Sequence, residues 1–209
     1  MPHLPLLVLG THNAKKGGEL VGLLESLPIQ VRTLADYPQA IDVIEDGTSF
    51  AENAEKKACQ QARHLDCWVL GEDSGLCVDA LEGQPGIYSA RFSGSEATDE
   101  KNNALLLEKM RAIEDGKRQA HYVCHIVISD PEGVVHETST GRCQGWIRRT
   151  GVGTNGFGYD PLFEIREYHR TFGELGGHLK SAISHRARAV SLIVPKIRKL
   201  LRRGVLPTA

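Results

Sequence analysis

Short continuous apolar runs are the clearest hydrophobic pattern in the first part of the chain. Residues 6–9 (Leu-Leu-Val-Leu) and 68–71 (Trp-Val-Leu-Gly) are such runs, and they are typical of strands buried on both faces of a sheet. A polar turn at residues 10–13 follows the first run, and residues 14–26 are expected to form a helix with Asn13 as its N-cap. This order of strand, polar turn and helix predicts that the chain begins with an α/β unit.

The same pattern, with its turn signals, predicts the rest of the secondary structure. Further strands are expected at residues 29–34, 76–78, 120–129, 134–141 and 143–148, and further helices at about 49–65, 98–113 and 184–201. Residues 49–52 (Ser-Phe-Ala-Glu) match a capping box, residues 130–133 (Asp-Pro-Glu-Gly) match a turn, and Pro195 is expected to kink the last helix. Residues 83–94 and 151–161 are expected to be loops. No linker interrupts the chain, so residues 1–209 are predicted to form one bilobed domain around a mixed sheet.

Composition adds limits on partners and location. The chain has 209 residues, 41% hydrophobic content and a formal net charge of −1, so there is a sizeable core and no bulk attraction to nucleic acid or a membrane. A polyanion would have to bind through a local cluster of cations. The N-terminus lacks the cationic flank and the apolar length of a signal or membrane segment, which predicts a cytoplasmic protein.

The cysteines support the same location. There are five, with no C-x-x-C pair, which is typical of reduced and mostly buried thiols. His121, Cys124 and His125 are near enough in sequence to suggest a metal site. They lie in a strand pattern, however, where neighbouring residues face opposite ways, so a structural role is expected.

The loop with the sequence Gly156-Phe157-Gly158-Tyr159-Asp160-Pro161 is the most informative motif. Glycine adds nothing to a packed strand, and a surface turn has no need of a large ring. The loop is therefore predicted to present the Phe157 ring to a flat ligand, with Asp160 accepting hydrogen bonds beside it. The alternative is a glycine-proline turn with Phe157 in the core. If this motif is considered without the rest of the sequence, the alternative is the better interpretation.

A second motif, Thr11-His12-Asn13-Ala14-Lys15-Lys16, lies where a strand leads into a helix. The free N–H groups of a helix N-terminus favour an anion. Thr11 and Asn13 can add donors, and Lys15 or Lys16 a full charge. In the alternative, Asn13 only caps the helix and the lysines are solvated.

Acidic residues form the third candidate. Glu72 and Asp73 follow a buried strand and precede Gly75, and both can face one ion only if the strand ends there. Carboxylates next to a phosphate are the usual environment of Mg²⁺, and Glu45 from the acidic loop 42–46 is the third expected ligand. A surface turn with solvated acids is an equally weighted alternative.

The last candidates precede and open the C-terminal helix. Ser184 is predicted to be its N-cap, which puts His185 and Arg186 in the first turn. An arginine there opposes the helix dipole, which indicates a nearby anion or carbonyl oxygen. The alternative is a solvent-facing arginine and a half-buried histidine. Lys57 by itself has the character of a surface lysine.

In chain order these motifs closely resemble those of the inosine/xanthosine triphosphate pyrophosphatase family, which removes non-canonical purine nucleotides. The resemblance covers nearly the whole chain. It rests on Thr11-x-Asn13-x-x-Lys16, Ser49-Phe50-x-Glu52-Asn53-Ala54, Asp73-Ser74-Gly75-Leu76, Pro85-Gly86-Ile87-Tyr88-Ser89-Ala90-Arg91, Gly156-Phe157-Gly158-Tyr159-Asp160-Pro161-x-Phe163 and Lys180-Ser181-Ala182-Ile183-Ser184-His185-Arg186.

The resemblance implies an α/β fold with a long mixed central sheet, flanking helices and two lobes around an active-site cleft. It also implies a homodimer that hydrolyses dITP, ITP and XTP to the monophosphate and pyrophosphate with Mg²⁺, one or more ions per subunit. Asp73 matches the catalytic acid and a metal ligand, Glu45 a second ligand, and Glu72 a less certain one. The implied substrate contacts are Thr11, His12, Asn13, Ala14, Lys15, Lys16, Lys57, Ser74, Phe157, Gly158, Tyr159, Asp160, Lys180, His185 and Arg186.

The chain departs from the family pattern in three places. Many relatives have glycine at the position of His12, and many bacterial relatives have aspartate at that of Glu72. Lys56 and Lys57 both fit the helix lysine, and Lys57 is chosen for its spacing from Asn53.

Donors from His185, Arg186 or backbone N–H groups are expected to bind the 6-oxygen of the base, which adenine lacks. A non-catalytic nucleotide sensor on the same scaffold is the alternative function, and it would not need Glu45 and Asp73.

Overall fold

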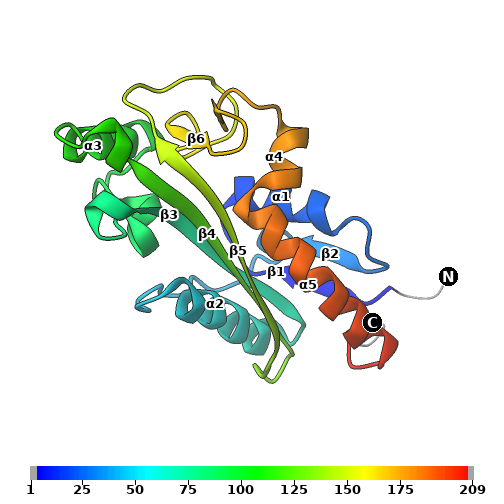
Figure 1. Ribbon diagram of the computed structural model, residues 1–209. Coiled ribbons are helices and arrows are strands. Elements are labelled where there is room, and N and C mark those ends of the chain that lie inside the picture. Colours follow the sequence, from blue (N-terminus) through cyan, green and yellow to red (C-terminus); the bar gives the residue numbers. More distant parts are fainter. Residues whose placement is uncertain (1–3, 207–209) are drawn as a thin grey trace. The chain divides into compact units, whose positions relative to one another are not determined.

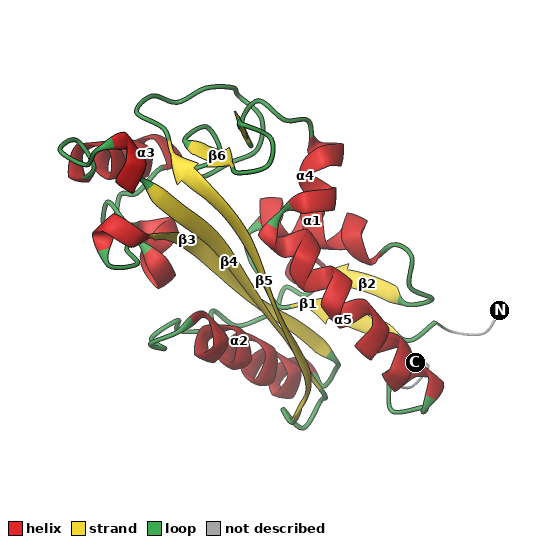
Figure 2. Cartoon of the chain, in the orientation of Figure 1, coloured by secondary structure: helices red, strands yellow, loops and turns green. Residues whose placement is uncertain are grey.

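The structure is a computed structural model that describes residues 4–206 (Figures 1 and 2). Its strands are β1 (Leu6–Leu9), β2 (Gln30–Thr33), β3 (Val69–Val78), β4 (Gln119–Ser129), β5 (Val135–Ile147), β6 (Phe163–Ile165) and β7 (Arg170–Thr171). Its α-helices are α1 (Ala14–Leu24), α2 (Phe50–Leu65), α3 (Asp99–Lys109), α4 (Gly177–Ile183) and α5 (His185–Arg202). Short 3₁₀ turns lie at Leu34–Asp36, Asp79–Leu81, Gly86–Arg91 and Asp115–Lys117.

The strands form one seven-stranded sheet in the order β2-β1-β3-β4-β5-β6-β7. β1 pairs in parallel with β2 and β3, whereas β6 pairs antiparallel with β5 and β7. The sheet is therefore mixed, and the predicted α/β class is confirmed.

The chain divides into two compact units. Within the described residues, the first contains 4–73, Cys124–Gly141 and 188–206, and the second contains Ser74–Val123 and Arg142–Ala187. Each unit has its own apolar core. Asp73 and Ser74 are consecutive residues of β3, so the boundary falls within that strand.

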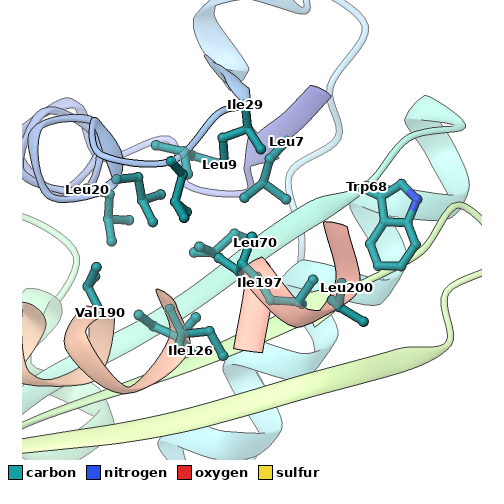
Figure 3. Packing of buried hydrophobic residues seen from close by; sticks show 14 of the residues in the cluster. Leu7, Leu9, Leu20, Ile29, Trp68, Leu70, Ile126, Val190, Ile197 and Leu200 are labelled. Carbon is teal, nitrogen blue, oxygen red and sulfur yellow. The ribbon is translucent and has the colours of Figure 1, made fainter. Parts of the chain in front are cut away.

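The core of the first unit explains its layers. Alternate strand residues point to opposite faces of a sheet, and Leu7, Leu70 and Ile126 pack with residues of α1 and α5 on one face (Figure 3). Val69 packs with residues of α2 on the other face. Helices thus cover both faces of these strands, as the continuous apolar runs predict.

Local signals predicted the helix starts correctly. Asn13, Ser49 and Thr98 each accept a hydrogen bond from a backbone N–H in the first turn of their helices. The capping box at α2 is only half formed, because the carboxylate of Glu52 accepts the N–H of Thr48, at 2.7 Å, instead of that of Ser49. The turn at residues 130–133 is also confirmed, with the Gly133 N–H 2.9 Å from the Asp130 carbonyl oxygen.

Several predicted boundaries are wrong. β5 is one strand, not two, because the alternation of buried and exposed residues continues through Gly141 and Arg142. β3 continues through Gly75 to Val78. The pattern missed α4, β6 and β7, which are short, and α4 follows a glycine N-cap. The last helix was predicted well, since Pro195 lies inside α5 and the helix ends at Arg202, one residue beyond the predicted end.

Two further findings concern redox state and membranes. Each of the five cysteines is a free thiol. Within residues 4–206, no helix combines the length and the apolar composition that crossing a bilayer needs.

Candidate active site

The start of α1 has the geometry of a capped helix N-terminus. The Asn13 Oδ1 accepts the N–H of Lys16 at 3.1 Å, and the Thr11 Oγ1 accepts the N–H of Asn13 at 3.2 Å. Ala14 opens the helix and Lys15 is exposed. The Lys16 side chain is largely buried, with its Nζ 3.2 Å from the Glu72 Oε2.

Lysine and carboxylate side chains gather at the first part of β3. We call Lys16, Glu45, Lys57, Glu72 and Asp73 the acid–lysine group. The Nζ of Lys57 lies 3.0 Å from the Glu45 Oε2 and 3.0 Å from the Asp73 Oδ1. Lys57 is only 8% exposed, so the expectation of a surface lysine is wrong. Its neighbour Lys56 pairs with Asp46 instead.

Close packing of α2 on β3 buries Lys57. A Cβ at Gly71 would lie 2.2 Å from the Ala54 carbonyl oxygen and 2.6 Å from the Ala58 backbone nitrogen. Only glycine permits this approach. Asn53, which is one helical turn before Lys57, also reaches the acids and donates to the Asp73 Oδ2 at 3.4 Å.

The two adjacent acids of β3 make different contacts. β3 continues through Gly75, so the condition under which both acids could face one ion is not met, and consecutive side chains alternate between the faces. Asp73 contacts Asn53 and Lys57. Glu72, which is 1% exposed, accepts a hydrogen bond from the Cys124 thiol at 3.4 Å and pairs with Lys16.

Burial and charge act against each other on these groups. Burial raises the pKa of Asp73, and the positive charges of Lys57 and Lys16 oppose that rise only in part. Burial lowers the pKa of Lys57, but the attraction of Asp73, Glu72 and Glu45 outweighs it, so that the pKa is raised overall. The group therefore holds a carboxylate that binds a proton more readily than a solvated one.

The carboxylates of the acid–lysine group have some of the features of a site for a hard divalent cation. In residues 4–206, no three His, Cys, Asp or Glu side chains stand close enough together to hold a metal ion. An oxygen of Glu45 and one of Asp73 nevertheless converge on the single ammonium of Lys57. Carboxylate oxygens that converge on one positive charge are the type of ligand that Mg²⁺ binds.

The turn between β1 and α1 contacts the acidic loop through His12. The His12 Nε2 lies 3.2 Å from the Ile41 carbonyl oxygen and 3.3 Å from the Asp42 Oδ1. The loop is also held by α2, since the Asn53 Oδ1 accepts the Gly47 N–H at 2.8 Å. His12 thus links the start of α1 to the segment that carries Glu45.

In the second unit, residues Gly156–Asp160, which we call the aromatic loop, are shaped by glycine. Gly156 has φ of +79°, and a Cβ there would lie 2.0 Å from the Asp160 Oδ2. That oxygen accepts the Phe157 N–H at 2.9 Å and the Lys180 ammonium at 2.6 Å. This oxygen of Asp160 therefore stabilises the conformation of the aromatic loop.

The two rings of the aromatic loop have different surroundings. Phe157 is half-buried, and the Lys180 Nζ lies 4.3 Å from the centre of its ring. Tyr159 is 3% exposed, belongs to the core, and donates its hydroxyl to the Ser89 carbonyl oxygen at 2.8 Å. The structure thus places Tyr159, not Phe157, in the core.

The start of α5 brings the remaining candidates into contact with neighbours. The Ser184 Oγ accepts the Ala187 N–H at 3.1 Å, as an N-cap does. The His185 ring stacks on that of Tyr122, with centres 4.6 Å apart and planes at 11°. Arg186 is 1% exposed and donates to the Ser74 Oγ at 2.9 Å, so the solvent-facing alternative is wrong.

The sequence reasoning gave no role to Asn53 or Tyr122. Asn53 lies four residues before Lys57 and thus on the same face of α2, which was a usable signal. Tyr122 resembles any core aromatic of a strand, and only its contact with His185 distinguishes it.

Comparison with known proteins gives the chain a family. The model of the Ham1 family matches residues 7–196. The chain belongs to the Ham1 family. This Ham1 chain is 50% identical over 195 residues to a dITP/XTP pyrophosphatase of Rhodopirellula baltica, with 93% of this chain and 94% of the relative covered. It is 46% identical over 193 residues to one of an Exiguobacterium species, with 91% and 96% covered.

Solved structures agree with the assignment. A HAM1 protein from Coxiella burnetii matches this Ham1 chain with a TM-score of 0.85 and 34% identity, over 93% of this chain and 98% of that one. A nucleoside-triphosphatase, dITP/XTP pyrophosphatase, from Mycobacterium abscessus matches with a TM-score of 0.74 and 40% identity, over 91% and 99%.

Proposed function

We propose that this chain hydrolyses the non-canonical purine nucleoside triphosphates dITP, ITP and XTP to the monophosphate and pyrophosphate. The names of its relatives, which are dITP/XTP pyrophosphatases, support the reaction. The observation that carries the proposal is the buried Asp73 carboxylate, held by Lys57 and Asn53. A non-catalytic sensor has no need of such a carboxylate, and no contact in residues 4–206 favours that function.

We propose Asp73 as the residue that orients and deprotonates the attacking water. The water oxygen forms a bond to the α-phosphorus, the bond from that phosphorus to the bridging oxygen breaks, and pyrophosphate leaves. Asp73 takes the proton. A general base works best when its pKa lies near the working pH, and burial shifts the pKa of Asp73 in that direction.

Glu45 and Asp73 are the residues that would hold Mg²⁺, one or more ions per subunit. When bound, Mg²⁺ supplies neutralisation of phosphate charge and orients the phosphate oxygens. Glu72 remains a weaker candidate, since it contacts Lys16 and Cys124. Its contacts support a role in holding Lys16 in place.

The triphosphate contacts would come from the cations and from the N-terminus of α1. Lys16 and Lys57 would offset negative charge on the substrate and on the leaving pyrophosphate. Thr11, His12, Asn13, Ala14 and Lys15 surround the N-terminus of α1, where backbone N–H groups favour an anion.

The purine would stack on Phe157, whose ring already has the Lys180 ammonium over it. The remaining proposed contacts of the nucleotide are Ser74, Gly158, Tyr159, Asp160, His185 and Arg186. Donors from His185 or Arg186 would bind the 6-oxygen of hypoxanthine or xanthine. An adenine would leave those donors unpaired, and a site of this type rejects the mismatch by about four to five powers of ten. We further propose that the enzyme is a homodimer.

A substrate panel tests the function. Purified protein is incubated with ITP, XTP, dITP, ATP and GTP with Mg²⁺, and the monophosphate and pyrophosphate are measured, with a chelator in parallel. We expect equal amounts of the two products from ITP, XTP and dITP, little turnover of ATP, which lacks the 6-oxygen, and none with the chelator. GTP also has the 6-oxygen, so its rate measures how strongly the 2-amino group is excluded. Release of orthophosphate and a nucleoside diphosphate, or equal rates with ATP, would contradict the proposal.

A further inference from the structure

One helix holds both backbone polar groups of Gly158. The Gly158 N–H donates to the Asp99 Oδ2 at 2.9 Å, and the Asn103 Nδ2 donates to the Gly158 carbonyl oxygen at 2.9 Å. Asp99 and Asn103 are four residues apart on α3 and therefore lie on one helix face. We call these two side chains the Gly158 clamp. Asp99, Asn103 and Gly158 all lie in the second unit.

The clamp acts next to the ring that is proposed to stack on the purine. Gly158 follows Phe157 directly and has φ of +62°. On the N-terminal side of the same residue, the Phe157 N–H donates to the Asp160 Oδ2. With the peptide groups before and after Phe157 held, the direction of its Cα–Cβ bond is fixed.

A second observation separates the clamp from ordinary loop packing. The Asn103 Oδ1 is buried and has no hydrogen-bond partner within residues 4–206. A buried polar atom without a partner is unfavourable. Rotation of the amide would not remove the problem, since it would place the oxygen against the Gly158 carbonyl oxygen. Asn103 thus makes the hydrogen bond to Gly158 even though its own Oδ1 is buried in an unfavourable environment.

We propose that Asp99 and Asn103 are positioning residues that set the affinity of the enzyme for the purine base by fixing Gly158 and, through it, Phe157. The inference rests on the proposed function, in which the base stacks on Phe157. The clamp orders the aromatic loop before the nucleotide binds. The entropy cost of ordering the loop therefore does not reduce the free energy of binding. Its loss weakens binding and leaves the chemical step unchanged.

The test is a set of variants with the KM and the kcat for ITP measured separately. Asn103→Ala removes the donor to Gly158, and we expect the KM to rise about three- to tenfold with kcat within about twofold. Asp99→Ala should raise the KM to a similar degree. Asp99→Asn keeps an acceptor oxygen, so its KM should be close to that of the wild type.

Thr98→Ala is the matched control. Thr98 caps the same helix by accepting the Lys101 N–H at 3.2 Å, whereas the hydrogen bonds to Gly158 come from Asp99 and Asn103. This variant weakens α3 at the same end and leaves the clamp in place, so its KM should stay at the wild-type value. An equal rise in KM for Thr98→Ala would show that general stability of α3 is responsible, and this would overturn the proposal.

The outcomes separate the clamp from the proposed function. If the wild type turns over ITP and Asn103→Ala has an unchanged KM, the clamp is refuted and the function stands. If the wild type has no turnover of any purine triphosphate, both are refuted. Hydrogen exchange of the ligand-free protein gives an independent check, because the Gly158 amide should exchange faster in Asp99→Ala than in Thr98→Ala, and equal rates would contradict the clamp.

Discussion

The acid–lysine group and the aromatic loop are built in opposite ways. In the first, every charged side chain except that of Glu45 projects from a helix or strand, and Lys57 on α2 meets Asp73 on β3 at 3.0 Å. In the second, backbone groups of an irregular segment are held by side chains, as Asp160 holds the Phe157 N–H. The first depends on a balance of charge, and the second on the shape of the main chain.

The difference shows where each region is sensitive to substitution. Removal of one charge from the acid–lysine group changes the pairing of the buried charges that remain. The aromatic loop carries little net charge and depends instead on glycine at positive φ, as at Gly156. We therefore expect substitutions in the acid–lysine group to lower kcat, and substitutions in the aromatic loop to weaken binding of the base.

The largest expected effect comes from Asp73→Asn. The amide keeps the shape of the side chain but cannot accept a proton from water, so kcat for ITP should fall by about 10²–10⁴-fold. Turnover is measured as pyrophosphate release under saturating ITP and Mg²⁺. Asp46→Asn is the control, because Asp46 is an exposed acid of the same loop as Glu45 and its loss should leave kcat within about twofold. Substantial Mg²⁺-dependent turnover by Asp73→Asn would refute the role of Asp73.

Phe157→Ala tests the second region. Loss of base stacking typically weakens binding by about 1–3 kcal/mol, so the KM for ITP should rise about 5- to 150-fold. The kcat at saturation should change little, since the acid–lysine group is intact. An unchanged KM would mean that the ring does not contact the base.

Gly156→Ala tests whether loop shape alone supports recognition. The added Cβ would clash with the Asp160 carboxylate at 2.0 Å, at a φ of +79°, and backbone strain of this type amounts to about 1–3 kcal/mol. We expect the KM for ITP to rise about tenfold. Gly151→Ala is the matched control, since a Cβ there makes an ordinary contact of 3.5 Å with Pro161. Equal effects of the two variants would contradict the account of Gly156.

The smallest expected effect is on stability. The raised pKa of Asp73 means that the folded state binds its proton more tightly than the unfolded state does. The ionised carboxylate therefore lowers stability above that pKa, and this penalty disappears as the pH falls through it. In chelator at pH 7–8, Asp73→Asn should melt a few degrees higher than the wild type, and the gap should narrow as the pH is lowered. A lower melting temperature would contradict the inferred direction.

Local and non-local features of the fold were not equally predictable from the sequence. The N-caps Asn13 and Ser184 were predicted because a cap depends on residues within one helical turn. The burial of Lys57 was not predicted, because it results from the close packing of α2 on Gly71 of β3, which is a contact between separate elements. The roles of Phe157 and Tyr159 also depend on distant partners, namely Lys180 and Ser89.

The division between the two regions is tested most directly by equilibrium binding of a non-hydrolysable ITP analogue to Asp73→Asn and Phe157→Ala, titrated side by side with the wild type in Mg²⁺. We expect the Kd of Asp73→Asn to stay within about threefold of the wild type, whereas that of Phe157→Ala rises about 5- to 150-fold. Equal losses of affinity, or a larger loss for Asp73→Asn, would contradict the division.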